Sequence, residues 1–203
     1  MKIIAVGRNY INHAKELNNP VPTEPVIFMK PDTAILKDNK DFYYPEFSDD
    51  VHYEVELVVR ICNEGKHVAS KFAHKYYDAI GLGIDFTARD VQTKLKERGL
   101  PWELAKSFDH SAVMSPLLAK TEFPNLNELE FSLKKNGETV QVGNTKNMIF
   151  DIQMLIVYIS KYITLRKGDL IYTGTPEGVG PVSIGDKLEG FIAEKAMFSC
   201  QVK

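Results

Sequence analysis

The sequence has little cysteine and no long apolar run. Its 203 residues include only two cysteines, Cys62 and Cys200, which are far apart in the chain. Two distant cysteines form neither a disulfide framework nor a paired-cysteine metal motif, and this favours a reducing compartment. No apolar stretch approaches the length of a membrane span, and the opening run Met1–Val6 is too short for a signal peptide. We therefore expect a cytoplasmic protein without a membrane partner.

The sequence also lacks an excess of charge of one sign. Lys and Arg number 25 and Asp and Glu number 27, which gives a formal net charge of -2. Binding to nucleic acid requires clustered Lys and Arg, whereas the lysines of this chain are scattered, so we expect no nucleic-acid partner. The hydrophobic fraction of 44% and the charged fraction of 26% are ordinary for a globular protein. The length fits a single domain over residues 1–203.

Apolar periodicity predicts several strands and a few short helices. Strands are predicted at residues 3–6, 53–62, 80–85, 129–133, 140–142 and 169–172, with a last pair of strands near the C-terminus. Helices are predicted at residues 10–17, 69–79, 87–98 and 150–162. Asn136-Gly137 predicts a hairpin turn. Because strands outnumber helices and are linked by hairpins, we expect an α+β fold with a mostly antiparallel sheet.

Two glutamates on one strand form the most informative pattern. The odd positions of the strand at 53–62 are apolar, so His52, Glu54 and Glu56 project from the opposite face. Neighbouring carboxylates repel each other, and a bound metal is the commonest feature that makes such crowding favourable. A solvent-facing strand with solvated glutamates is the alternative, and Arg60 on the same face also suits it. A second metal hypothesis takes His52 as a ligand together with the two glutamates.

Asp85 favours a metal site built from three carboxylates. It ends the strand at 80–85, and Gly81 and Gly83 on its own face are expected to leave room above the sheet for a ligand. An aspartate at a strand end is also common without any ligand. Three carboxylates suit a hard cation such as Mg²⁺ or Mn²⁺, with Ca²⁺ able to occupy the same site, and argue against zinc.

Two polar pairs are spaced three residues apart on predicted helices. His13 and Glu16 therefore share one helix face, and a carboxylate beside an imidazole is the usual build of a general base. An exposed helix pair is the alternative. Arg89 and Gln92 fall in the first turns of the next predicted helix, where a guanidinium could hold a substrate carboxylate through two hydrogen bonds.

Lys106 and a glycine-rich loop are weaker signals. Lys106 has apolar neighbours, which is suggestive but not specific. The loop at 173–181 lacks the Gly-Lys-Ser/Thr ending of a P-loop. We expect it instead to offer backbone N–H groups and the Thr175 hydroxyl to an anionic substrate.

Seven segments occur in an order that carries a resemblance spanning nearly the whole chain. They are Gly7–Tyr10 with His13 and Glu16, Pro25–Pro31, His52–Glu56, Asp85–Gln92, Gly99–Trp102, Leu104–Phe108 and Thr173–Pro181. Each segment is modest alone, but together they are specific. In this order they resemble the fumarylacetoacetate hydrolase family, and within it the small acylpyruvase and oxaloacetate decarboxylase type.

The resemblance implies a fold, an assembly and a set of site residues. It implies a mixed, mostly antiparallel β-roll with a few short helices, a homodimer, and a lid formed by the helix that carries His13. It also implies that His13 activates water while Glu16 orients it. The metal ligands that it implies are Glu54, Glu56 and Asp85, and the substrate contacts are Arg89, Gln92, Lys106 and Thr175.

The predicted activity is metal-dependent hydrolysis of a carbon–carbon bond in an acylpyruvate-type 2-oxo acid. Lys106 or Gln92 is expected to assist the developing charge. Decarboxylation of oxaloacetate passes through a similar enolate, so one site could perform both reactions. Two alternatives stay open. One is an isomerase of the 2-hydroxyhepta-2,4-diene-1,7-dioate type, and the other is a module that binds a 2-oxo acid without turning it over.

Overall fold

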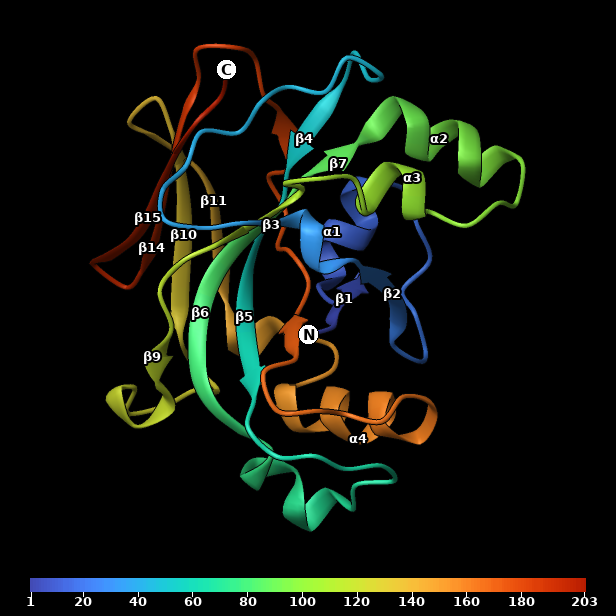
Figure 1. Cartoon of the computed structure of the whole chain (residues 1–203), viewed down its shortest axis with the longest axis vertical. Helices are drawn as coiled ribbons and strands as arrows, with labels where there is room; N and C mark the ends of the chain where they lie inside the picture. The colour runs from blue at the N-terminus through green and yellow to red at the C-terminus, as the bar shows by residue number, and fades with distance from the viewer.

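Two larger sheets and one small sheet form the body of the computed structural model, which describes all 203 residues (Figure 1). The largest sheet contains β1 (Ile3–Gly7), β2 (Val26–Lys30), β3 (Ile35–Leu36), β5 (Val55–Ile61), β6 (Tyr77–Asp85), β8 (Ala112–Met114), β9 (Leu118–Ala119) and β12 (Leu170–Tyr172). Its strand order is β2-β1-β12-β5-β6-β8-β3, and β9 pairs with β6.

The other two sheets flank the largest one. The second sheet has the order β11-β10-β14-β15. It contains β10 (Glu130–Lys135), β11 (Glu138–Asn144), β14 (Lys187–Ile192) and β15 (Lys195–Gln201). The third, with the order β13-β4-β7, contains β4 (Val51–Tyr53), β7 (Thr87–Ala88) and β13 (Gly180–Pro181). Among the named strands only the pairs β1–β12 and β3–β8 are parallel, so the predicted α+β fold with a mostly antiparallel sheet is confirmed.

The helices are short and lie at the periphery. They are α1 (Ile11–Glu16), α2 (Arg89–Glu97), α3 (Glu103–Lys106) and α4 (Ile152–Tyr162), with 3₁₀ turns at Asp32–Ala34, Ser70–Lys75, Lys120–Glu122 and Thr145–Asn147. Figure 1 shows α1, α2 and α3 gathered on the side of β5 and β6 that lies away from the second sheet. None of the helices combines the length and the apolar character that crossing a membrane would require.

The main core lies between the largest sheet and the second sheet. The alternation predicted for the strand at 53–62 is confirmed, because Val55, Leu57 and Val59 are fully buried and join Phe131 and Leu133 of β10 in one cluster of 36 buried residues. Full burial of such a side chain stabilises the fold by about 1.5–3 kcal/mol. The opposite face of β5 is buried too, since Val58 packs in a second cluster with β1 and β12. Glu56, beside Val58 on that face, is therefore inside the protein, whereas Arg60 near the end of the strand is partly exposed and pairs with Asp78.

The hairpin predicted at Asn136-Gly137 is confirmed. Asn136 has a φ of 54° and Gly137 a φ of 86°, the two left-handed conformations that a type I′ turn requires. The turn joins β10 to β11 in the register Lys135↔Glu138.

Two of the predicted helices differ from the structure. Residues 69–79 form only the 3₁₀ turn Ser70–Lys75, and β6 already begins at Tyr77 because that residue pairs with Ile61 of β5. The pairing with a neighbouring strand overrides the local helical preference. The helix predicted at 87–98 begins two residues later, at Arg89, because Thr87 and Ala88 pair with β4.

Candidate metal centre and active site

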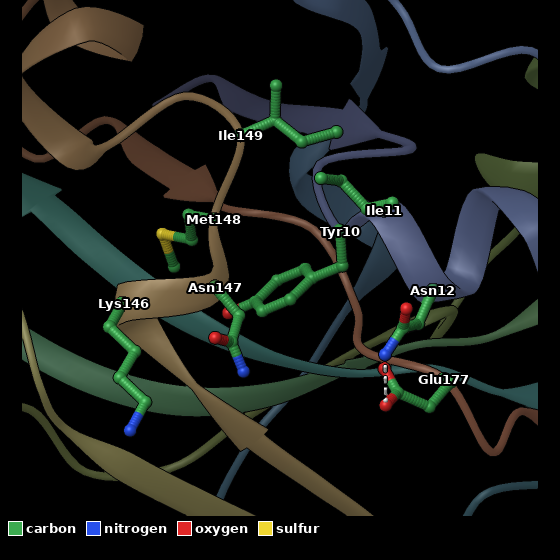
Figure 2. Close-up of a pocket in the computed structure, with 8 residues that line it drawn as sticks. All are labelled: Tyr10, Ile11, Asn12, Lys146, Asn147, Met148, Ile149 and Glu177. Atoms are coloured by element: carbon green, nitrogen blue, oxygen red, sulfur yellow. Dashed lines mark hydrogen bonds between the residues drawn. The ribbon is translucent and has the colours of Figure 1, made fainter.

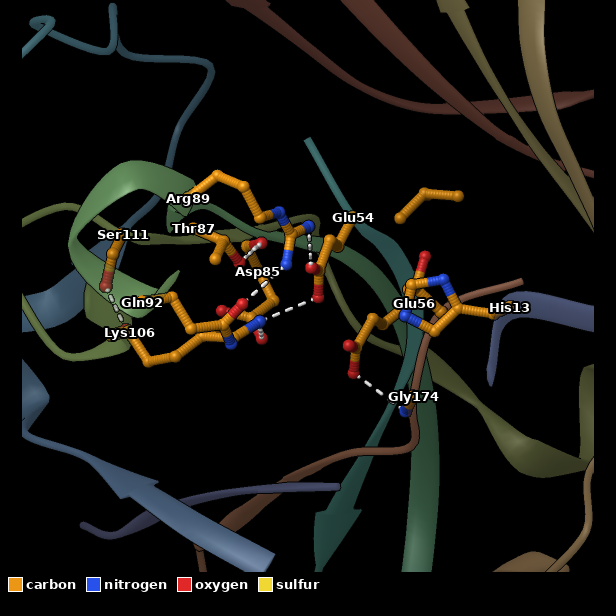
Figure 3. Close-up of polar contacts among 12 residues, drawn as sticks. His13, Glu54, Glu56, Asp85, Thr87, Arg89, Gln92, Lys106, Ser111 and Gly174 are labelled. Atoms are coloured by element: carbon orange, nitrogen blue, oxygen red, sulfur yellow. Dashed lines mark hydrogen bonds and ion pairs between the residues drawn. The ribbon is translucent and has the colours of Figure 1, made fainter. Parts of the chain in front are cut away.

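Three carboxyl groups lie together in the interior, beside α1 and α3 (Figure 3). They belong to Glu54, Glu56 and Asp85, and one oxygen of each lies within 4.8 Å of those of the other two. The three residues are only 4%, 1% and 1% exposed. The alternative of a solvent-facing strand with solvated glutamates is therefore wrong.

A break in the predicted strand brings the three groups together. β4 ends at Tyr53 and joins the third sheet, whereas β5 begins at Val55 in the largest sheet. Glu54 occupies the break, and its carbonyl oxygen accepts a hydrogen bond of 2.8 Å from the backbone N–H of Asp85. The end of β6 is thus fixed beside the break, and the side chains of neighbouring strands converge there.

The same break directs His52 elsewhere. Its Nε2 lies 2.9 Å from Oδ1 of Asp50, and His52 is not part of the carboxyl cluster. The geometry therefore gives no support to a metal-ligand set that includes His52. The third carboxyl group beside Glu54 and Glu56 is that of Asp85.

The room that we predicted above Gly81 and Gly83 is filled by other side chains. A side-chain carbon added at Gly83 would lie 2.7 Å from Cε1 of Tyr172, and one added at Gly81 would lie 2.8 Å from Cε of Met114. The Tyr172 hydroxyl is fixed there because it donates a hydrogen bond of 2.8 Å to the carbonyl oxygen of Val113. These glycines therefore admit packing against the sheet rather than a ligand.

Three basic side chains balance the carboxyl cluster. Nζ of Lys106 lies 2.7 Å from Oε2 of Glu54 and 2.7 Å from Oδ2 of Asp85. Arg89 donates to Oε1 of Glu54 at 2.6 Å, and Nζ of Lys30 lies 2.6 Å from Oδ1 of Asp85. Glu54 lies in the break between β4 and β5, and the other four groups come from β2, β6, α2 and α3, so the cluster connects the largest sheet with α2 and α3 (Figure 3).

The pKa shifts identify the carboxyl group whose negative charge the three basic side chains do not compensate. Burial alone would lower the pKa of Lys106, but the charges of Asp85 and Glu54 outweigh it and raise the pKa. Burial opposes ionisation of Glu54, yet the charge of Lys106 holds its pKa well below the usual range. Burial, followed by the charges of Asp85 and Glu54, raises the pKa of Glu56 well above its ordinary value. Glu56 is thus the carboxyl group whose negative charge is least compensated.

The residues of the cluster fit a divalent cation. The only hydrogen bond to the Glu56 carboxyl group comes from the backbone N–H of Gly174 at 2.8 Å, and no basic side chain lies within 4.0 Å of it. A cation among the three carboxyl groups would supply the missing positive charge. An all-oxygen donor set suits Mg²⁺, Mn²⁺ or Ca²⁺ better than zinc.

The predicted pair on α1 faces the same cluster. Nδ1 of His13 lies 3.4 Å from Oε2 of Glu16, and His13 is 4% exposed. Oε1 of Glu16 accepts a hydrogen bond of 3.0 Å from the backbone N–H of Gly178, which joins α1 to the glycine-rich loop. If Nδ1 is protonated and donates a hydrogen bond to Glu16, Nε2 is unprotonated and keeps a free lone pair. Burial lowers the pKa of His13, which favours this neutral form.

The backbone N–H groups of the glycine-rich loop form hydrogen bonds with carboxyl groups of the protein itself. The N–H group of Gly174 donates a hydrogen bond to Glu56, and that of Gly178 donates one to Glu16. They are therefore not free to bind a substrate in the way that we had predicted. The Thr175 hydroxyl oxygen accepts a hydrogen bond of 2.9 Å from Gln141.

A small cavity of about 30 Å³ lies in front of the cluster. Its lining includes six of the predicted residues, which are His13, Glu54, Glu56, Gln92, Lys106 and Thr175. Arg89 is absent from the lining, because its guanidinium is engaged by Glu54 and by Gln92 at 2.7 Å. Three residues that we did not predict, Arg8, Lys96 and Trp102, line the outer part.

A larger hollow of about 550 Å³ lies between the start of α1 and the turn Thr145–Asn147 (Figure 2). It shares no residue with the small cavity. Its single carboxylate, Glu177, accepts a hydrogen bond of 3.0 Å from Asn12. The hydroxyl of Tyr10 is buried there without a partner. This hollow contains no cluster of acidic groups and no basic group paired with one, so we do not place the chemistry in it.

Lys30 is the member of the cluster that sequence reasoning missed. It ends β2, and it is 2% exposed. Its ammonium group donates to Oγ of Ser111 at 3.0 Å and to the carbonyl oxygen of Lys106. The available signal was a lysine that ends the apolar run Val26–Met29 directly before a proline, and such a position does not reveal which carboxylate the lysine will meet.

Comparisons of the sequence with known proteins give a consistent family. The profile described as "Fumarylacetoacetate (FAA) hydrolase C-terminal" matches residues 2–202. The mitochondrial oxaloacetate tautomerase FAHD1 of Mus musculus is 45% identical over 190 residues, which cover 94% of this chain and 86% of that protein. The mitochondrial oxaloacetate decarboxylase of Dictyostelium discoideum is 43% identical over 189 residues, which cover 93% and 87% of the two chains.

Solved structures agree with this assignment. The fumarylpyruvate hydrolase of Pseudomonas aeruginosa, in complex with Mn²⁺ and pyruvate, matches with a TM-score of 0.94 at 34% identity and covers 100% of this chain and 89% of that one. A protein of Yersinia pestis CO92 assigned to the same family matches with a TM-score of 0.96 at 38% identity, with coverages of 100% and 93%. The chain therefore belongs to the fumarylacetoacetate hydrolase family, as the order of its motifs predicted.

Proposed function

We propose that this chain is a divalent-metal-dependent enzyme that moves a proton next to the 2-oxo group of oxaloacetate and so interconverts its keto and enol forms. The observation that carries the proposal is that His13, paired with Glu16, lines the same cavity as Glu54 and Glu56, two members of the cluster of three buried carboxyl groups. The relatives named as an oxaloacetate tautomerase and an oxaloacetate decarboxylase support the choice of substrate.

Glu54, Glu56 and Asp85 would hold the cation through their carboxylate oxygens. When bound, a divalent cation supplies a Lewis acid that polarises the 2-oxo group and makes the adjacent C–H more acidic. We propose Mg²⁺ or Mn²⁺, and the Mn²⁺ of the P. aeruginosa hydrolase supports this choice. Ca²⁺ would suit the same oxygen donors.

His13 is the proposed carrier of the proton. Burial lowers its pKa, so the neutral imidazole is available to accept a proton at Nε2. Glu16, beside Nδ1, would stabilise the imidazolium that forms and hold the ring in one orientation. Return of the same proton to carbon or to the enolate oxygen completes the interconversion.

Lys106 is proposed to stabilise the negative charge that develops on the substrate oxygen. The charges of Asp85 and Glu54 raise its pKa despite its burial, so it acts as an ammonium donor and not as a base. Gln92 and Thr175 line the cavity and would contact the substrate through their polar groups. Arg89 would act through Gln92 and Glu54, since its guanidinium is already engaged by both.

Hydrolysis of an acylpyruvate is the second candidate. A volume of about 30 Å³ corresponds to the space of roughly one water molecule, and His13 lines it. In this reaction His13 would deprotonate that water, and the oxygen would attack the distal carbonyl carbon. The carbon–carbon bond then breaks to give a carboxylic acid and the enolate of pyruvate, which takes up the proton. The name of the P. aeruginosa hydrolase supports this candidate.

The test compares metal-free and metal-loaded protein on three kinds of substrate. Protein treated with a chelator is reloaded with Mg²⁺ or Mn²⁺ and assayed for enol–keto conversion and decarboxylation of oxaloacetate, for cleavage of an acylpyruvate and for isomerisation of a 2-hydroxy-dienedioate. We expect cation-dependent turnover of oxaloacetate. Binding of 2-oxo acids without any turnover would instead identify a binding module, and turnover of a 2-hydroxy-dienedioate alone would identify an isomerase.

The assembly and the location remain proposals. We propose a homodimer, which light scattering after size-exclusion chromatography tests directly. The two distant cysteines favour a reducing compartment, and we propose the cytoplasm. The relatives above are named as mitochondrial, so cell fractionation has to distinguish the two locations.

A further inference from the structure

Two basic side chains at the outer part of the cavity have no acidic partner. Arg8 and Lys96 line this part together with Trp102. No carboxylate lies within 4.0 Å of either group, since neither takes part in any of the twelve ion pairs of the chain. Lys96 donates one hydrogen bond of 3.2 Å to Asn19, and the Arg8 guanidinium lies over the Trp102 ring at 5.6 Å. Both charges are therefore available to an anion.

The backbone holds Arg8 in an unusual conformation that directs its side chain. Arg8 follows β1 directly and has a φ of 61°, a left-handed conformation that is unfavourable for a residue other than glycine. Such conformations persist where the surrounding structure fixes them, and they cluster at functional sites. The stacking on Trp102, which comes from the segment before α3, defines the position of the guanidinium.

Arg8 and Lys96 differ from ordinary surface residues because other positive charges lie near them. Lys30, Lys106 and Arg89 already pair with Glu54 and Asp85 behind the cavity, which leaves only Glu56 without a basic partner. Burial lowers the pKa of Lys96, and so do the charges of Arg8 and Arg89, which shows that these positive groups are close enough to repel each other. With a divalent cation bound, the cavity would carry a clear positive excess toward solvent.

We infer that Arg8 and Lys96 bind the second carboxylate of a short 2-oxo dicarboxylate, and so select dianionic substrates such as oxaloacetate over monoanionic acylpyruvates such as acetylpyruvate. The inference rests on the proposed function in one respect, namely that the 2-oxo acid end of the substrate lies at the carboxyl cluster. It deepens that function, because it names the class of substrate, a 2-oxo acid with a second carboxylate, that the outer part of the cavity would select.

The first experiment measures KM for oxaloacetate and for acetylpyruvate in the metal-loaded enzyme. Arg8→Gln with Lys96→Gln should raise KM for oxaloacetate about tenfold or more, as expected for the loss of charged hydrogen bonds, and change KM for acetylpyruvate less than twofold. Lys94→Gln, on the exposed part of α2, and Arg98→Gln, at the exposed residue that follows α2, are the matched controls. They remove the same charges from positions outside the cavity and should leave both KM values unchanged.

The second experiment measures binding without turnover. Calorimetry on the Mn²⁺-loaded protein compares malate with 2-hydroxybutanoate, which share a four-carbon chain and differ in the second carboxylate. We expect the wild type to prefer malate about tenfold or more and the double variant to lose that preference. Equal weakening of both ligands, or an unchanged preference, would overturn the inference. Preference for malate without turnover of any 2-oxo acid would contradict the proposed function and leave the inference intact.

Discussion

The ammonium group of Lys30 and the carboxylate of Asp85 form an ion pair of 2.6 Å in which both side chains are almost completely buried. Lys30 also donates to Ser111 and to the carbonyl oxygen of Lys106. One buried lysine thus orients a carboxyl group of the cluster and the backbone of a second residue that contacts it. Lys30 supports the geometry of the site from behind and does not line the cavity.

Lys30→Met should destabilise the protein by about 3–5 kcal/mol, because removing one partner of a buried ion pair leaves the other charge uncompensated. The measurement is the free energy of unfolding in a denaturant titration. Lys187→Met is the matched control, since Lys187 forms an exposed pair with Glu189 at 2.8 Å, and exposed pairs contribute about 0–1 kcal/mol. Equal losses in the two variants would contradict a special role for Lys30.

The contrast between Lys30 and the hairpin shows what the sequence could predict. Asn136-Gly137 determines its own turn through local backbone preferences, so the hairpin was predictable from two residues. The alternation of β5 likewise predicted its core face. The partners of Lys30 lie 55, 76 and 81 positions further along the chain, and no local pattern specifies such contacts.

The same reasoning explains the errors around the site. Gly81 and Gly83 predicted free space, but whether that space is filled depends on Met114 and Tyr172, which belong to other strands. Arg89 and Gln92 were predicted as neighbours and are neighbours. Their spacing could not show that the guanidinium is directed at Glu54 and that Arg8, from a distant segment, faces the cavity instead.

Glu56→Gln should stabilise the metal-free protein at neutral pH and abolish its stabilisation by Mg²⁺ or Mn²⁺. Burial and the charges of Asp85 and Glu54 raise the pKa of Glu56 in the folded state. The contribution of protonated Glu56 to the free energy of unfolding is therefore fully present at low pH. This contribution is lost as pH rises through the raised folded-state pKa. A neutral amide escapes that loss. The measurement is Tm against pH with and without metal, and a wild-type Tm that shows no such pH-dependent loss relative to the variant would contradict this account.

The activity of the wild type should persist below the ordinary pKa of histidine. Burial lowers the pKa of His13 from 6.5, and a base must be unprotonated to accept a proton. The acidic limb of the kcat/KM profile should accordingly fall below pH 6.5, and it should disappear in the residual activity of His13→Gln. A limb above pH 6.5 would assign the titration to another group.

Arg89→Lys should weaken metal binding more than it changes KM. An ammonium cannot reproduce the planar fork that donates to Glu54 and Gln92 at once. Glu54 would then lose one of the contacts that orient its carboxylate. The measurement is the Kd for Mn²⁺ by calorimetry beside KM for oxaloacetate. A large rise in KM with an unchanged Kd would show that Arg89 contacts the substrate, as its position in the motif had suggested.

The reactions proposed for this site make different demands on His13. Enol–keto conversion requires a group that removes and returns a proton, and hydrolysis requires an activated water. Decarboxylation of oxaloacetate requires no base for the bond-breaking step, because the electron pair of the breaking carbon–carbon bond forms the enolate directly as CO₂ leaves. The three reactions share the carboxyl cluster, so loss of Glu54 should reduce all of them together.

His13→Ala should therefore separate them. Loss of a positioned general base typically costs on the order of 10²–10⁴-fold in rate, so enol–keto conversion and acylpyruvate cleavage should fall by that amount. Decarboxylation should fall far less. The measurement is kcat/KM for the three reactions on the wild type, His13→Ala and Glu54→Ala. Equal losses in His13→Ala would mean that His13, which belongs to α1 and is 4% exposed, closes the cavity or places the substrate. In that case the proposal that His13 transfers a proton would have to be abandoned. The movement of α1 relative to the loop at Gly178 would then become the step to study.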